Sequence, residues 1–283
     1  MGGVILLSCL AWWLPCVRAF VLAAGLLALS PVPAVAQPAA EIRVGGSGAA
    51  QGTMNLLAQA YTRAQPGMRV TVLPGLDSGG GIKALLAGAL HLAVSARDLT
   101  SAESQAGAVA VELGRTPVVW ATAAGHVVPG LTTQQLVDIY AGSRAVWPDG
   151  SKLRLVLRPS TDSEVLRQLS SAMRDALAIA EQRKGTVVAL TDQEAARDIE
   201  SIPGALGPTT LALILSENRA LQALALDGVM PTAQTIAAGT YPLHIGLSVV
   251  TGPATSAQAQ EFVAFLRSPQ AAEILQRTGH WLK

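Results

Sequence analysis

The chain has 283 residues, of which 50% are hydrophobic and 14% are charged, and its 20 Lys and Arg residues nearly balance its 19 Asp and Glu residues. This balance argues against a nucleic-acid-binding surface, which usually carries net positive charge. Both cysteines, Cys9 and Cys16, fall near the N-terminus, so a chain that loses a leader there has no disulfide framework, thiol nucleophile or cysteine-ligated metal. No later stretch offers the roughly 20 apolar residues of a membrane-spanning helix.

The N-terminal segment, residues 1–36, is expected to be a secretory signal peptide. Arg18 precedes an apolar run that ends near the small residues Ala34-Val35-Ala36, a pattern typical of a leader and its cleavage site. Lipid attachment at Cys9, after Leu6-Leu7-Ser8, is the alternative. We expect cleavage after Ala36, because a full apolar stretch follows Arg18, and therefore an exported mature protein.

Strand and helix patterns alternate along the rest of the chain, which is typical of an α/β fold with helices on both faces of a sheet. Strands are expected at residues 41–45, 69–73, 90–95, 117–122, 153–157, 186–190 and 245–250. Helices are expected at residues 53–64, 131–140, 256–267 and 268–277, and helical spacing of apolar residues marks two more across residues 82–89 and 165–177. Thr191 and Glu194 form a capping box for a further helix, Ser268 and Pro269 begin the last one, and residues 202–208 are expected to be a loop.

Three turns that lead from a strand into a helix are small and polar: residues 45–48, 77–81 and 160–163. Helix N-termini present unpaired N–H groups and partial positive charge, so three such turns would bind an oxyanion if they converged. Helix dipoles contribute only about 0.3–1 kcal/mol each, whereas micromolar binding requires about 8 kcal/mol. Charge-assisted hydrogen bonds must supply the rest, and the candidate cations are Arg158, directly before the third turn, and Arg97, after the third expected strand.

Each of these features also has a structural explanation. Ser47 and its glycines make a tight turn, Thr161 and Glu164 match a capping box, and either arginine is a candidate for a solvated surface charge. The glycines after Ser78 are harder to explain by capping, because glycine disfavours a helix start unless the backbone must approach something closely.

Enzyme motifs are missing from the sequence: it has no nucleophile elbow, no zinc-protease motif and no P-loop. Its histidines, His91, His126, His244 and His280, lack the spacing of a metal site. The glycines at residues 46, 48 and 52 miss the dinucleotide fingerprint by one residue, so a Rossmann-like enzyme is a remote alternative. We expect a binding protein without catalytic activity, cofactor or metal.

Several motifs follow one another across nearly the whole mature chain. They are residues 46–48, 77–83, 93–100, 129–132, 138–142, 158–163, 203–207, 241–243 and the ending 262–279. Together they resemble the periplasmic phosphate-binding proteins (PstS-like) of ABC importers. The resemblance implies a type II periplasmic binding protein fold, with residues 37–117 and 243–283 in lobe 1, residues 118–242 in lobe 2, and two crossing strands between them.

The resemblance also implies a function. Phosphate, or a similar oxyanion, would close the two lobes, and the closed, monomeric periplasmic protein would deliver it to a permease in the inner membrane; no nucleic acid partner is expected. The turns, the arginines and the resemblance together give the candidate ligand-binding residues Ser47, Gly48, Ala49, Ala50, Asp77, Ser78, Gly79, Gly80, Arg97, Arg158, Ser160, Thr161, Asp162 and Ser163.

Three positions depart from the family's pattern. Ala50 stands where the family often has threonine, residues 161–163 read Thr-Asp-Ser where Ser-Gly-Thr is expected, and Ala96 stands where many members have the acidic residue that accepts the proton of hydrogen phosphate. These departures leave the identity of the ligand open.

A carboxylate in the site favours protonated phosphate, because fully ionised sulfate would face it without a proton between them. Asp98 or Asp162 is the candidate for that role. Without it, Arg97 would suit a doubly charged oxyanion such as sulfate, molybdate or tungstate. Phosphate is the expected ligand, and a sensor domain without transport is the other alternative.

Overall fold

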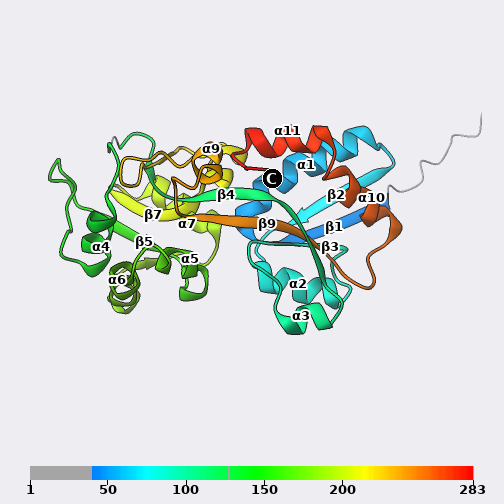
Figure 1. Ribbon diagram of the computed structural model, residues 1–283, viewed down its shortest axis with the longest axis horizontal. Coiled ribbons are helices and arrows are strands. Elements are labelled where there is room, and N and C mark those ends of the chain that lie inside the picture. The colour runs from blue at the N-terminus through cyan, green and yellow to red at the C-terminus, as the bar shows by residue number, and fades with distance from the viewer. Residues whose placement is uncertain (1–39, 127, 283) are drawn as a thin grey trace, which may run out of the picture. The chain divides into compact units, whose positions relative to one another are not determined.

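The computed structural model describes residues 40–126 and 128–282, drawn in Figure 1. The expected leader, its cleavage site after Ala36 and the candidate lipidation site Cys9 lie outside these residues. Within them, no helix has the length and apolarity needed to cross a membrane.

The described chain has a mixed α/β fold, which confirms the expected fold class. Its strands are β1 (Ala40–Gly46), β2 (Met68–Leu73), β3 (Leu92–Ser95), β4 (Val109–Ala123), β5 (Arg154–Leu157), β6 (Val187–Val188), β7 (Ala205–Thr210), β8 (Leu221–Ala223) and β9 (His244–Thr251). Its α-helices are α1 (Gln51–Ala64), α2 (Ser78–Leu86), α3 (Ser101–Gln105), α4 (Thr133–Ala141), α5 (Glu164–Arg167), α6 (Ser171–Gln182), α7 (Asp192–Ser201), α8 (Leu211–Ser216), α9 (Ala233–Ala237), α10 (Ala257–Phe265) and α11 (Pro269–Arg277). Two short 3-10 helices, η1 (Gly48–Ala50) and η2 (Ser160–Asp162), precede α1 and α5.

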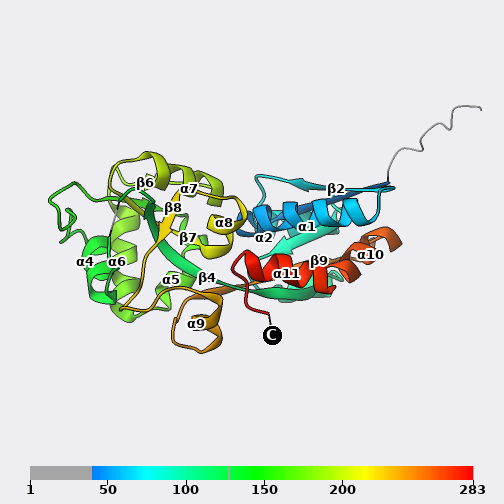
Figure 2. The same cartoon turned by 90° about the horizontal axis from the view of Figure 1, so that it is seen from above.

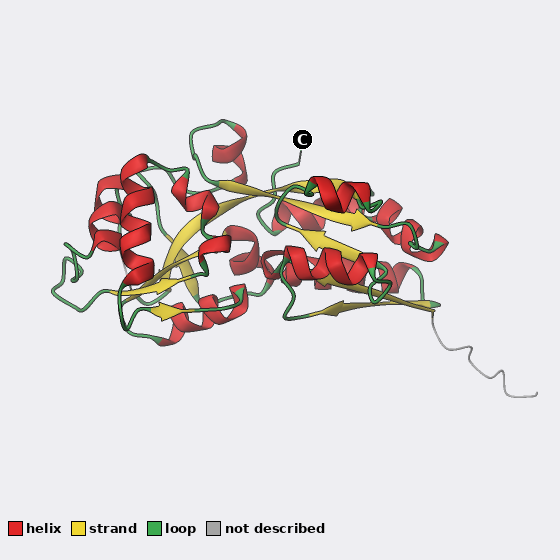
Figure 3. Ribbon diagram, turned by 90° about the horizontal axis from the view of Figure 1, so that it is seen from below, coloured by secondary structure: helices red, strands yellow, loops and turns green. Residues whose placement is uncertain are grey.

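The strands form a mixed sheet in the order β2-β1-β3-β9-β4-β7-β5-β6, and β8 also pairs with β4. β1 is parallel to β2 and β3, and β5 is parallel to β6 and β7, whereas β9 is antiparallel to both of its neighbours. Helices lie on both faces of the strands (Figure 3), as parallel strands require, because their faces are apolar on both sides. On one side α1 lies beside α11 (Figure 2).

Strand β4 takes part in two halves of this sheet. From Val109 to Pro117 it pairs with β9, beside which it runs in Figure 1, and from Val118 to Ala123 it pairs with β7 and β8. The β4–β9 register shifts between Glu112 and Gly114, and Gly114 has a φ of +157°. An extra residue at a bulge of this kind bends and twists the strand.

Two groups of apolar side chains flank this point. Leu57, Leu92 and Phe262 belong to one core, and Trp120 and Trp147 belong to another. β4 supplies the first core through Leu113 and the second through Trp120, so it links them. A division into lobes of residues 37–117 with 243–283 and residues 118–242 stays a proposal, because the described chain belongs to one compact unit.

Most of the expected elements are present, and two of the expectations are wrong. The capping box of Thr191 with Glu194 and the start of α11 at Ser268 and Pro269 are confirmed. The single helix expected across residues 165–177 is instead α5 and α6, because the Ser170 side chain accepts a hydrogen bond from the Met173 N–H and begins a new helix.

The expected loop at residues 202–208 contains most of β7. This strand is buried along its whole length and pairs with β4 and β5. Gly207 and Pro208 caused the error, since both are uncommon in central strands. Pro208 lies opposite Trp120 of β4, beyond Leu206, where the pairing of β7 with β5 ends.

Candidate functional site

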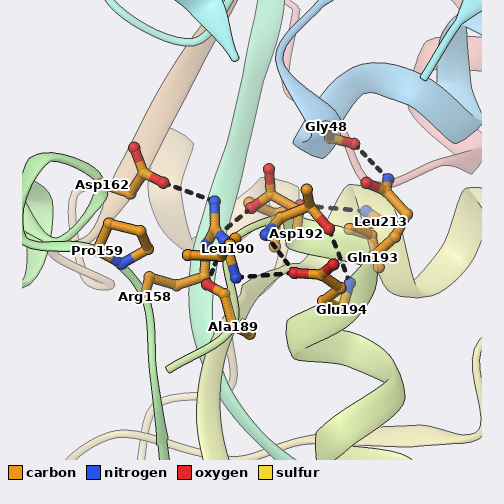
Figure 4. A network of polar contacts seen from close by, with 12 residues as sticks. Gly48, Arg158, Pro159, Asp162, Ala189, Leu190, Asp192, Gln193, Glu194 and Leu213 are labelled. Atoms are coloured by element: carbon orange, nitrogen blue, oxygen red, sulfur yellow. Dashed lines mark hydrogen bonds and ion pairs between the residues drawn. The ribbon is translucent and has the colours of Figure 1, made fainter. Parts of the chain in front are cut away.

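Arg158, directly after β5, is a buried cation with only 8% of its side chain exposed. Its Nη1 donates to the Ala189 carbonyl oxygen at 2.7 Å, its Nη2 donates to Asp162 Oδ2 at 2.6 Å, and its Nε lies 3.7 Å from Asp192 Oδ1 (Figure 4). It is therefore not a solvated surface charge. A guanidinium has five N–H donors, so the two hydrogen bonds leave donors for a further anion.

The third turn wraps around this arginine. Ser163 is buried, and its hydroxyl donates to the carbonyl oxygens of Arg158 and Pro159 at 3.4 and 3.2 Å. Ser160, Thr161 and Asp162 form the exposed η2. The capping box suggested for Thr161 and Glu164 is wrong, because Ser163 is the N-cap of α5 and no side chain caps that helix.

The first turn lies at the end of β1. The Ser47 N–H donates to the Val94 carbonyl oxygen at 2.9 Å, and a Cβ on Gly46 would lie 2.0 Å from that same oxygen, so only glycine fits there. Ser47 itself is buried, and its side chain makes no capping hydrogen bond to η1. Beyond it, the Gly48 carbonyl oxygen accepts a hydrogen bond from Gln193 Nε2 at 2.8 Å.

The second turn is held by its own side chains. Asp77 Oδ1 accepts from the Gly80 N–H at 2.5 Å, and Ser78 Oγ accepts from the Ala96 N–H at 3.0 Å. A Cβ on Gly81 would lie 2.6 Å from the Gly46 Cα. The close backbone approach that the glycines suggested is thus, for Gly81, a contact with the first turn.

Arg97 is in a different environment. Its side chain is 41% exposed, and its guanidinium donates to both carboxylate oxygens of Glu103 at 2.8 and 2.9 Å and to the Asp98 carbonyl oxygen at 2.8 Å. These hydrogen bonds from Arg97 lower the pKa of Glu103 to about 2. Asp98 is exposed. Gly79 of the second turn lies near Arg97, since a Cβ on this glycine would be 3.5 Å from Arg97 Nη2.

Asp192 is the residue that sequence reasoning missed. It is the first residue of α7, and in addition to its approach to Arg158 its carboxylate is stabilised by the backbone N–H of Ala49. Burial raises its pKa, and the charge of Arg158 opposes that rise. In the sequence, the only sign of Asp192 is that it is an acidic residue at the start of a helix. Acidic residues are common there because they stabilise the helix dipole, so this sign does not point to a ligand.

The first turn is therefore in contact with the second turn and, through Asp192, with Arg158 at the start of the third. The first turn contacts the second through Gly46 and Gly81, and it contacts Arg158 through Asp192. Among residues 40–126 and 128–282, no cluster of His, Cys, Asp and Glu could hold a metal ion. The arrangement offers backbone donors and one buried cation, which are the groups that bind an oxyanion.

Residues 31–270 match the model of the PBP superfamily domain. The chain belongs to the PBP superfamily. Among its relatives, the phosphate-binding protein PstS of Bacillus subtilis is 26% identical over 238 residues, which cover 80% of this chain and 75% of the relative. That of Borreliella burgdorferi is 22% identical over 248 residues, covering 84% and 88%.

Solved structures of oxyanion-binding proteins share the fold. A Clostridium perfringens protein described as a phosphate ABC transporter substrate-binding protein, with bound phosphate, matches with a TM-score of 0.73 and 19% identity over 86% of this chain and all (100%) of that one. The periplasmic molybdate-binding protein of Azotobacter vinelandii matches with a TM-score of 0.61 and 18% identity, covering 86% and 99%. The fold is thus the type II periplasmic binding protein fold.

Proposed function

We propose that this protein is the solute-binding component of an ABC importer and binds phosphate, or a related tetrahedral oxyanion, at the first turn and Arg158. The observation that carries the proposal is the buried guanidinium of Arg158, held in place by Ala189 and Asp162. A cation that is buried, oriented and still has unused donors is suited to an anion, because its charge-assisted hydrogen bonds contribute about 1.5–3 kcal/mol each.

The remaining parts of the proposal are drawn by analogy with the superfamily. The ligand would be held between two lobes and delivered to a permease of the inner membrane, and the protein would act in the periplasm as a monomer without catalysis of its own. Two curated relatives are phosphate-binding proteins, which supports phosphate as the ligand.

Molybdate is the second candidate ligand, because a molybdate-binding protein shares the fold. Because positive and negative charges nearly balance over the chain, no general positive field attracts the anion. Local hydrogen-bond donors must therefore account for the affinity, whether the ligand is phosphate or molybdate. Ser160 and Thr161 of the third turn are exposed hydroxyl residues suited to this role, and Thr161 Oγ1 now donates to Asp162 Oδ1 at 3.5 Å.

Calorimetric titration of the mature protein with phosphate, sulfate, molybdate and tungstate tests the proposal. We expect micromolar or tighter binding of phosphate, and a loss of at least about a hundredfold in Arg158→Ala, corresponding to about 2.7 kcal/mol. Arg154→Ala is the matched control, because Arg154 is an exposed arginine at the start of β5, the strand that ends directly before Arg158. Absence of binding to all four anions, or equal affinities in the wild type and Arg158→Ala, would contradict the proposal.

A further inference from the structure

The carboxylate of Asp192 contacts two groups that a bound oxyanion would use. Its Oδ1 lies 3.7 Å from Arg158 Nε, and the backbone N–H of Ala49 stabilises its charge. Its Oδ2 comes so close to the first turn that a Cβ on Gly48 would be 2.7 Å away. Asp192 therefore lies between the buried cation and the first turn, as Figure 4 shows for its position beside Arg158.

Other negative charges surround Asp192. Asp162 shares Arg158 with it through the 2.6 Å hydrogen bond to Nη2, and Glu217 adds a second negative charge that disfavours the ionised carboxyl. Glu217 has its own cation, since Arg219 Nη2 lies 2.7 Å from its Oε2. Arg158 is thus the cation that compensates both Asp162 and Asp192.

This arrangement treats oxyanions differently according to whether they carry a proton. Sulfate or molybdate, fully ionised, would place oxygen against the Asp192 carboxylate with no hydrogen between them. Hydrogen phosphate brings a P–OH group, which donates a hydrogen bond to a carboxylate, and O–H···O⁻ bonds of this kind are short and strong. A carboxylate on the site rejects one class of anion and accepts the other.

The two acidic residues suggested by the sequence are less well placed. Asp98 is exposed, and Arg97 donates to its backbone carbonyl oxygen. Asp162 has one carboxylate oxygen bonded to Arg158 Nη2, and it contacts the cation from within its own turn. Asp192 differs from both because it reaches Arg158 and the first turn together.

We propose that Asp192 is the specificity-determining residue of the site: its carboxylate accepts the proton of a protonated oxyanion and disfavours anions that have none. The inference rests on the proposed function, because it concerns the same anion site. It assigns to α7 the role that the sequence left open between Asp98 and Asp162.

Titration of the wild type, Asp192→Asn and Asp98→Asn with phosphate and with sulfate tests this assignment, at a pH where phosphate is mainly the hydrogen phosphate dianion. In Asp192→Asn the ratio of phosphate to sulfate affinity is expected to fall at least about tenfold, or about 1.4 kcal/mol, through weaker phosphate and tighter sulfate binding. Asp98→Asn, which alters an exposed carboxyl, is expected to keep the wild-type ratio.

Each other result overturns the assignment in a recognisable way. An unchanged ratio in Asp192→Asn, or an equal rise in affinity for both anions, would show that Asp192 does not select. A wild type that binds neither anion would overturn the proposed function and this inference together. Thermal melting checks that Asp192→Asn is folded, and Asp192→Ser carries the same test if it is not.

Discussion

Arg158 and Arg97 both follow a strand and both enter a polar turn, yet the structure uses them differently. Arg158 is 8% exposed, and besides Asp162 in its own turn it contacts Ala189 and Asp192, which lie more than 30 positions along the chain. Arg97 is 41% exposed, and its carboxylate partner Glu103 is six positions away. A positioned cation is recognised by burial and by partners distant in sequence, neither of which the local sequence reports.

The two sites should differ in what they contribute to stability. An exposed ion pair contributes about 0–1 kcal/mol because water screens it. Removing one partner of a buried pair costs more, since it leaves a charge without compensation. Substitutions matched between the two arginines therefore test whether burial determines the difference.

The largest effect is expected from Arg158→Ala compared with Arg97→Ala. Arg158→Ala leaves Asp162 and Asp192 without their cation and should lower the free energy of unfolding by about 2–3 kcal/mol, less than the ~3–5 kcal/mol of fully buried pairs. Arg97→Ala should cost about 0–1 kcal/mol. Urea denaturation of both variants measures the difference, and equal losses would remove the distinction.

A second pair of variants compares the turns beside the two arginines. A Cβ on Gly48 would lie 2.7 Å from Asp192 Oδ2, whereas a Cβ on Gly79 would lie 3.5 Å from Arg97 Nη2, an ordinary contact. Gly48→Ala should weaken phosphate binding about tenfold, at the low end of the ~1–3 kcal/mol cost of overpacking. Gly79→Ala should leave the affinity nearly unchanged, and calorimetry would show the reverse order if the second turn dominated binding.

The raised pKa of Asp192 gives a pH-dependent difference between the wild type and Asp192→Asn. Because burial raises this pKa, the stability contributed by the carboxyl is present below its ordinary pKa of about 3.9 and is lost as pH rises through the raised value. Asp192→Asn should therefore gain stability relative to the wild type as pH rises toward neutral. Urea denaturation across that range measures it, and a constant difference would contradict the assigned direction.

The smallest effect on stability is expected at Glu103, whose pKa is lowered, so that its stability changes with pH in the opposite direction to that of Asp192. Hydrogen bonds from Arg97 lower its pKa to about 2, so its contribution is present above the ordinary pKa of about 4.3 and is lost as pH falls through about 2. Glu103→Gln should lose this acid dependence at a cost within about 1 kcal/mol. Thr100 would keep an acceptor in the glutamine side chain, so a larger loss would indicate a second role for Glu103.

Much of the fold is encoded locally and was predictable. Alternating apolar and polar residues predicted a strand at residues 69–73, observed as β2. The capping box of Thr191 with Glu194 predicted the start of α7. The errors came where tertiary packing overrides local preference: β7 includes Pro208 because β5 pairs with residues 205 and 206 and β4 pairs with residues 207–210. Ser170 divides a continuous apolar pattern into α5 and α6 by capping the second helix.

The candidate site was predictable only in part for the same reason. Motifs identified Arg158 and the three turns, because each is a short run of residues with a recognisable chemistry. Asp192 belongs to no such run, and its significance comes from Arg158 and Ala49, which the fold brings to it. Gly81 was correctly suspected of a close backbone approach, but its contact is the Gly46 backbone.

Strand β4 also bears on how this protein can be divided. Its first part pairs with β9 and its last part with β7 and β8, so a cut between the two cores passes through the middle of one strand. A fragment ending at residue 242 would lack β9, and with it the strand between β3 and β4. Neither half is therefore suited to expression alone. Sites for inserting another domain, or for new termini in a circular permutant, are best chosen outside β4 and β9.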